Sequence, residues 1–301
     1  MSQGLRQGRP SSGRQELTAG TGTGQAGPAP VGRRPPAWDT LHAEWTKLRT
    51  LPGTGWLLLA AAVLTIAVSA AAAGAFACAP AHGGCTPAAT GADPAKIGLT
   101  GVYLGQAVIA VLGVLVIGGE YGTGMMRVTL AAMPRRLNVL AAKALVAVGC
   151  GVAAGVAGVL GSVLASQLIE PGRGLTAAHG YVPLSLANGA DLRAAAGTVL
   201  YFALIALLAL GVTTAVRDSA VGIGITLGLL YLFPILTAAI PDHTLARHLD
   251  QIAPMTAGLD IQATVGLSSL PLTPWQGLGV TAAWAAGALI LGAAVLRLRD
   301  A

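Results

Sequence analysis

The stretch GGEYGTGMMRVTLAAMPRR, residues 118–136, holds the most distinctive chemistry of the sequence, set between two apolar runs. It combines one carboxylate, at Glu120, with four glycines and three arginines. The glycines permit a sharp turn. Residues from about 125 to 132 can form a short helix with Met126, Leu130 and Met133 on one side, and Pro134 ends it. An amphipathic helix of this kind is typical of a contact with another protein. We expect the Glu120 charge to reach water at the edge of the preceding apolar run.

Two other groups of residues could bind a metal ion or form a disulfide. Cys78 and Cys85 lie close together in one loop, and a disulfide between them and two separate thiols are both open alternatives. With His82 they would supply only three metal ligands, too few to favour zinc. A second cluster could also hold a metal, but a solvated face is the favoured interpretation; it contains Asp242, His243, His248 and Asp250.

The sequence contains no recognisable catalytic constellation. It has three lysines, Lys47, Lys96 and Lys143, and none follows a glycine, so no phosphate-binding loop of the G-x-x-x-x-G-K-[ST] type exists. No G-x-S-x-G or H-E-x-x-H motif occurs either. We therefore expect no enzyme activity, no bound cofactor and no resident metal in this chain.

Composition indicates a membrane protein. Of the 301 residues, 54% are hydrophobic and only 10% charged, against roughly 25% charged in soluble domains. Apolar segments long enough to cross a bilayer recur six times. None carries an ionisable residue at its middle, which argues against ion-coupled transport. We predict an all-α membrane protein with six transmembrane helices, spanning about 56–77, 99–117, 139–169, 194–216, 220–240 and 275–296.

Three regions follow from these patterns. Residues 1–37 are rich in Gly, Pro, Ser and Arg and predict a disordered tail. Residues 38–50 predict an amphipathic helix in the headgroup layer, with its apolar residues on one face, and an ordinary juxtamembrane anchor is the alternative. Residues 51–301 form the membrane domain. The residues of the interfacial helix are Trp38, Leu41, Glu44, Trp45, Lys47, Leu48 and Arg49.

Charge predicts the orientation in the membrane. Fourteen of the eighteen Lys and Arg residues fall on the side that holds both termini and the 118–143 connection. The positive-inside rule makes that side cytoplasmic, with the chain in the cell membrane. The basic residues are dispersed and lack interleaved aromatic residues, so nucleic acid is not an expected partner.

Two motifs and the six-span plan together resemble the permease subunit of a type-2 ATP-binding-cassette (ABC) transporter of the small actinobacterial kind. The motifs are EWTKLRT at 44–50 and GEYGTGMMRVTLAAMPRR at 119–136. The family's second motif reads G-x-E-[YF]-x-x-G-T-x-[RK]-x-x-L, followed by a basic pair and a lysine. This sequence departs from it at Gly122, often Arg, and at Met125, often Thr or Ser.

The resemblance implies a division of labour. A separate cytoplasmic ATPase would bind ATP and Mg²⁺ and grip the 120–136 connection, and a second permease copy would complete the pathway for a hydrophobic or amphipathic cargo. The 242–274 loop would hold short re-entrant helices near an external gate. A stand-alone protein with an immunity or scaffolding role and a lipid-modifying enzyme are the alternatives. The implied coupling residues are Glu120, Tyr121, Gly124, Arg127, Leu130, Arg135 and Arg136.

Overall fold

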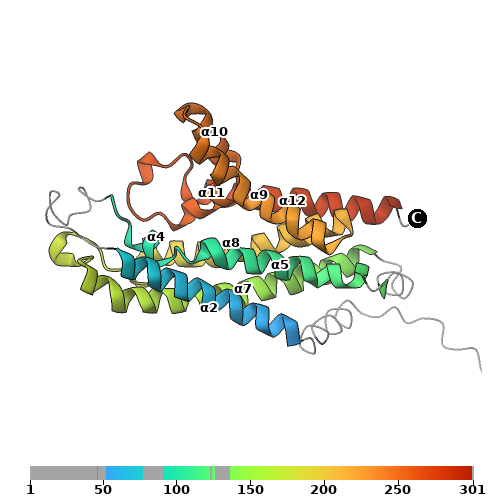
Figure 1. Ribbon diagram of the computed structural model, residues 1–301, viewed down its shortest axis with the longest axis horizontal. Helices are drawn as coiled ribbons and strands as arrows, with labels where there is room; N and C mark the ends of the chain where they lie inside the picture. Colours follow the sequence, from blue (N-terminus) through green and yellow to red (C-terminus); the bar gives the residue numbers. More distant parts are fainter. Residues whose placement is uncertain (1–45, 47–51, 77–90, 123, 126–135, 300–301) are drawn as a thin grey trace, which may run out of the picture. The chain divides into compact units, whose positions relative to one another are not determined.

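The computed structural model describes residues 46, 52–76, 91–122, 124–125 and 136–299, which belong to one compact unit, Pro36–Ala301 (Figure 1). Every regular element in these residues is a helix. The predicted tail 1–37, the interfacial helix 38–50 apart from Thr46, Cys78, Cys85 and most of the 126–136 stretch lie outside the described residues.

Six helices are long and apolar enough to cross a membrane, which confirms an all-α chain compatible with a multi-pass membrane protein. The predicted 139–169 segment is the longest of them, at 34 residues or about 50 Å at 1.5 Å per residue. The six are α2 (Pro52–Ala75), α5 (Val102–Gly122), α7 (Arg136–Ile169), α8 (Gly189–Val216), α9 (Ser219–Ala239) and α12 (Pro274–Arg299).

Helix α8 forms the centre of the bundle and packs against α5, α7, α9 and α12 (Figure 1). Its Tyr201, Phe202 and Leu208 are fully buried. Helices α2, α9 and α12 instead expose large apolar side chains, including Trp56 and Ile290. Soluble proteins rarely expose so much contiguous apolar surface, so this outer face suits a lipid bilayer.

Small residues let the helices approach closely. A Cβ atom built on Gly101 would lie 1.8 Å from the carbonyl oxygen of Thr65 in α2, so no larger residue fits there. In α7, a Cβ atom at Gly151 would lie 2.9 Å from the Cα atom of Ala203 in α8. The glycine spacing of α7 therefore serves packing within this chain.

The two ends of the bundle differ in construction. One, the Glu120 end, is made by the end of α5, the starts of α7 and α9 and the ends of α8 and α12. The other, the Lys96 end, carries the short elements α4 (Pro94–Gly98), η2 (Glu170–Arg173), η3 (Ala177–His179), α10 (His243–Ile252), α11 (Pro254–Leu259), η4 (Asp260–Gln262) and η5 (Leu267–Ser269). The expected short helices of the 242–274 loop are thus present.

Candidate functional site

A buried ion pair joins the two helices that flank the 120–136 connection. Lys143, two turns into α7, donates from Nζ to Oε1 of Glu120 in the last turn of α5, at 2.9 Å. The same nitrogen donates to the carbonyl oxygen of Val116 at 3.2 Å. The Lys143 side chain is 1% exposed and that of Glu120 is 12% exposed. The two helices that carry the connection are therefore joined by an inward-facing charged contact.

The expectation that the Glu120 charge reaches water is wrong. Helix α5 continues to Gly122, two residues beyond Glu120, and turns the carboxylate toward α7. A lysine this deeply buried needs a compensating anion because an unpaired buried charge is strongly destabilising. Attraction between the charges, strengthened by the low dielectric of the interior, holds the carboxylate inside.

The remaining coupling residues divide into described and undescribed ones. Tyr121 packs against the apolar core of the bundle. Gly124 has a φ of +71°, a left-handed backbone conformation that favours glycine, and the neighbouring Met125 is exposed. Arg136 is the first residue of α7. Arg127, Leu130 and Arg135 lie outside the described residues.

Other elements meet at the same end through the turn between α8 and α9. Arg217 closes α8 with a φ of +65° and donates from Nη2 to the carbonyl oxygen of Val295 in α12, at 3.1 Å. Asp218 caps α9 by accepting from the Val221 N–H at 2.8 Å. Close to the connection, one contact therefore joins α5 to α7 and another joins the end of α8 to α12.

Three residues at this end were not among the predicted site residues: Lys143, Arg217 and Asp218. The signal for Lys143 was its position in an apolar helix, 23 residues after an acid that ends the previous one. Arg217 and Asp218 stand alone between two long apolar runs, where a turn needs a helix cap.

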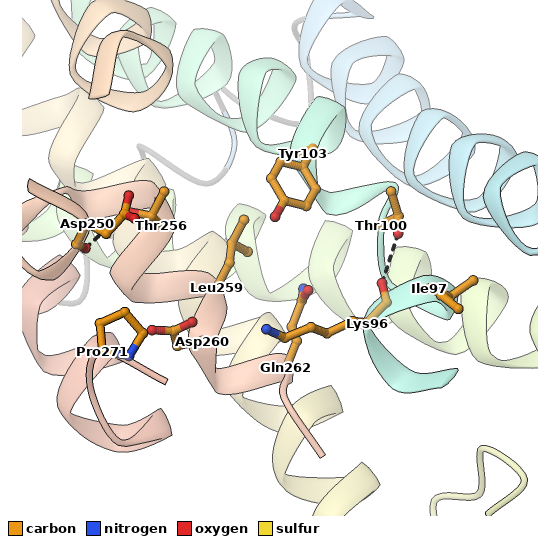
Figure 2. A pocket seen from close by; sticks show the side chains of 10 residues that line it. All are labelled: Lys96, Ile97, Thr100, Tyr103, Asp250, Thr256, Leu259, Asp260, Gln262 and Pro271. Atoms are coloured by element: carbon orange, nitrogen blue, oxygen red, sulfur yellow. Dashed lines mark hydrogen bonds between the residues drawn. The ribbon is translucent and has the colours of Figure 1, made fainter. Parts of the chain in front are cut away.

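The Lys96 end contains a polar cavity of about 370 Å³ (Figure 2). Its walls come from α4 and the start of α5 on one side and from α10, α11 and η4 on the other. It is lined by Lys96, Ile97, Thr100, Tyr103, Asp250, Thr256, Leu259, Asp260, Gln262 and Pro271.

One acid of this cavity has an unusual proton affinity. Burial raises the pKa of the Asp260 carboxyl to about 6; the nearby Lys96 ammonium opposes the rise and the Asp250 carboxylate adds to it. Desolvation disfavours the charged form of an acid, and here it outweighs the attraction of the lysine. Asp260 therefore titrates near neutral pH.

The structure assigns a simpler role to the possible metal cluster of residues 242–250. Asp242 caps α10, accepting from the Thr244 N–H at 2.8 Å and the Leu245 N–H at 3.3 Å. His243 and His248 are exposed. Within the described part of the chain, no three His, Cys, Asp or Glu residues gather as metal ligands.

No protein-family model matches the chain, and no curated protein matches it. The ion pair and the polar cavity are therefore defined by their own geometry and chemistry.

Proposed function

We propose that this chain is the membrane-spanning permease subunit of an ABC transporter, driven by a separate ATPase that docks on the 120–136 connection. The observation that carries the proposal is the buried pair of Glu120 and Lys143. The connection starts at the end of α5 and finishes at the start of α7, and the ion pair joins these two helices.

The ion pair links the connection mechanically to the helix bundle. A partner that displaces the connection displaces α5 and α7 together, since the 2.9 Å contact between Lys143 and Glu120 joins them and opposite charges in the interior are costly to separate. The permease needs only two states that the ATPase binds with different affinity. A charged contact that makes two rigid helices move together fits a change between two such states.

In this proposal the energy source lies in another protein. The sequence has no phosphate-binding loop for ATP, so ATP and Mg²⁺ are assigned to the partner. The excess of Lys and Arg on the side of the Glu120 end supports a cytoplasmic position for both termini and for the connection. A soluble ATPase could then reach it from inside the cell.

The cargo is proposed to be hydrophobic or amphipathic and to be exported. Support comes from an apolar cavity of about 530 Å³ between α8, α9 and α12, lined among others by Leu208, Val212, Trp284 and Leu291. Cavities of this size and lining suit apolar molecules. A second copy of the permease completes the pathway in this proposal.

Co-purification from native membranes tests the proposal. The full chain is purified in mild detergent, ATP hydrolysis is measured, and any P-loop polypeptide is identified by mass spectrometry. We expect ATPase activity with the unaltered chain. Replacement of residues 126–133 by a flexible linker of equal length should abolish it, because the segment proposed to dock the ATPase is lost.

A matched control replaces residues 265–270, at the Lys96 end, with the same kind of linker and should keep the ATPase. An unaltered chain that purifies without ATPase activity would support a stand-alone immunity or scaffolding role instead. Loss of the ATPase from both linker variants would show that the docking site is not specific to the connection.

A further inference from the structure

The cavity at the Lys96 end brings opposite charges to facing walls. Lys96 extends from α4, and Asp250 and Asp260 come from α10 and η4, more than 150 residues later in the chain. Figure 2 shows the Lys96 side chain reaching across the cavity toward the side that holds Asp260. One ammonium group therefore faces two carboxylates.

These charges are close enough to interact but are not in contact. The Lys96 ammonium acts on the Asp260 carboxyl through space. Among the residues that the structure describes, no ion pair or side-chain hydrogen bond engages the charged groups of Lys96, Asp250 or Asp260. The cavity separates them, so a molecule placed between them can contact both signs of charge.

The lysine wall is held in place by a buried carboxylate. Asp93 caps α4 by accepting from the Ala95 N–H at 3.0 Å. The same side chain accepts from the Thr264 N–H at 2.6 Å, the Thr264 hydroxyl at 2.7 Å and the Val265 N–H at 3.1 Å. One side chain thus fixes α4, which carries Lys96, against the segment that follows η4. A site fixed before binding loses less entropy when a ligand arrives.

The opposite wall and the floor are equally constrained. Gln262 is 2% exposed and donates from Nε2 to the Thr198 hydroxyl of α8, at 3.2 Å. Thr256 donates from its hydroxyl to the carbonyl oxygen of Asp250 at 3.0 Å, linking α10 to α11. Leu259 and the ring of Tyr103 add apolar surface. Small-molecule sites combine this kind of pre-formed hollow with a few fixed polar groups.

We propose that this cavity binds a small zwitterion, a molecule with a primary ammonium group and a carboxylate or phosphate a few ångströms apart. The ligand's ammonium faces Asp250 and Asp260, and its anionic group faces Lys96 and the Gln262 amide. A molecule with one charge alone would satisfy one wall and leave the other unpaired, which is unfavourable in a half-buried site. The inference goes beyond the proposed transport function and does not depend on an ATPase.

Two sources could supply this chemistry: a soluble amino acid or short peptide, and an ethanolamine phospholipid headgroup. The cavity volume of about 370 Å³ suits a ligand of either size. Two soluble probes represent them, glycylglycine and O-phosphoethanolamine, with ethanolamine and acetate as singly charged controls.

Isothermal titration of the full chain in phospholipid-free detergent tests the inference. We expect at least one zwitterion to bind saturably, and ethanolamine and acetate to bind at least about tenfold more weakly, a difference of about 1.4 kcal/mol. Lys96→Met and Asp260→Asn should each weaken zwitterion binding about tenfold or more. Asp250→Asn repeats the test if Asp260→Asn does not fold.

Asp242→Asn is the matched control, since it removes an exposed carboxylate at the same end outside the cavity and keeps a capping side chain. It should bind like the unaltered chain. No saturable binding of either zwitterion, or unchanged binding by Lys96→Met and Asp260→Asn, would overturn the inference.

Binding in nanodiscs distinguishes the two possible sources of the ligand, a soluble zwitterion and a phospholipid headgroup. Phosphatidylglycerol discs that also contain phosphatidylethanolamine should weaken O-phosphoethanolamine binding if the lipid headgroup occupies the cavity. Equal affinity in discs with and without phosphatidylethanolamine would identify a soluble zwitterion as the ligand. Both results presuppose the saturable binding that the inference requires.

Discussion

The Glu120 end and the Lys96 end use opposite charges in different ways. At the Glu120 end, Lys143 and Glu120 touch at 2.9 Å and are almost wholly removed from solvent. At the Lys96 end, Lys96 and Asp260 influence each other across a cavity without forming an ion pair. The contact at the first end serves to connect helices, while the separation at the second end keeps charges available to a ligand.

Backbone architecture explains this difference. Glu120 and Lys143 lie on two long helices, so their positions are fixed by the packing of the whole bundle. Lys96 and Asp260 lie on elements of five and three residues. Such short elements are not stable alone and depend on cross-links such as the Asp93 carboxylate. Breaking the two kinds of contact should therefore give different responses.

The largest effect should follow from breaking the ion pair. Lys143→Met removes the ammonium that the Glu120 carboxylate contacts at 2.9 Å, and we expect a loss of about 3–5 kcal/mol in the free energy of unfolding. Adding Glu120→Gln to this variant should restore much of the loss, because no charge then remains. Chemical unfolding of the detergent-solubilised chain, followed by circular dichroism, measures both variants.

Arg297→Met, an exposed substitution at the same end, is the control for that experiment and should change the free energy of unfolding little. Equal stability of Lys143→Met and the unaltered chain would mean that the pair does not join α5 to α7.

A smaller and more local effect should follow from Asp93→Ala. The substitution removes the acceptor of four N–H groups and one hydroxyl, so we expect a loss of about 2–4 kcal/mol, confined to the Lys96 end. Hydrogen exchange should become faster in 95–98 and 264–265 and stay unchanged near Lys143. Equal acceleration at both ends would contradict the independence of the two regions.

The smallest effect should be the pH dependence contributed by Asp260. Its folded-state pKa of about 6 lies above the usual value of an aspartate, so folding favours the protonated form. That contribution is complete below about pH 4 and is lost as pH rises through about 6. Asp260→Asn should therefore raise the melting temperature relative to the unaltered chain at pH 7.5, and change it less at pH 4.5.

Lys96 and Asp250 are present in both the unaltered chain and the Asp260→Asn variant. In the unaltered chain, Lys96 lowers the pKa of Asp260 and Asp250 raises it. If Asp260→Asn stabilised the chain more at pH 4.5 than at pH 7.5, the upward shift of this pKa would be contradicted.

Much of the fold was predictable because six apolar runs of sufficient length leave few alternatives. The helix boundaries were less predictable from the sequence. The second predicted span starts at Leu99, whereas α5 starts at Val102, because the three residues between form a turn after α4. Helix α8 starts at Gly189 rather than near 194 because Asn188 caps it by accepting from the Ala190 N–H.

The charged sites were harder to predict because they depend on distance in space. The connection at 118–136 was identified from its composition, but the inward turn of Glu120 depends on Lys143 in the next helix. The cavity joins Lys96 to Asp260, whose proximity follows from how α11 and η4 return against α4 and α5. No periodicity in the sequence specifies that return.

The side of the membrane on which the connection lies decides whether a cytoplasmic ATPase can reach it. In a background with Cys78, Cys85 and Cys150 replaced by serine, Arg127→Cys and Val265→Cys are labelled separately with a membrane-impermeant maleimide. We predict that Arg127→Cys reacts only in inside-out vesicles and Val265→Cys, exposed at the Lys96 end, only in right-side-out vesicles. Labelling of Arg127→Cys from the cell exterior would rule out the proposed permease function, since no cytoplasmic ATPase could then reach the connection.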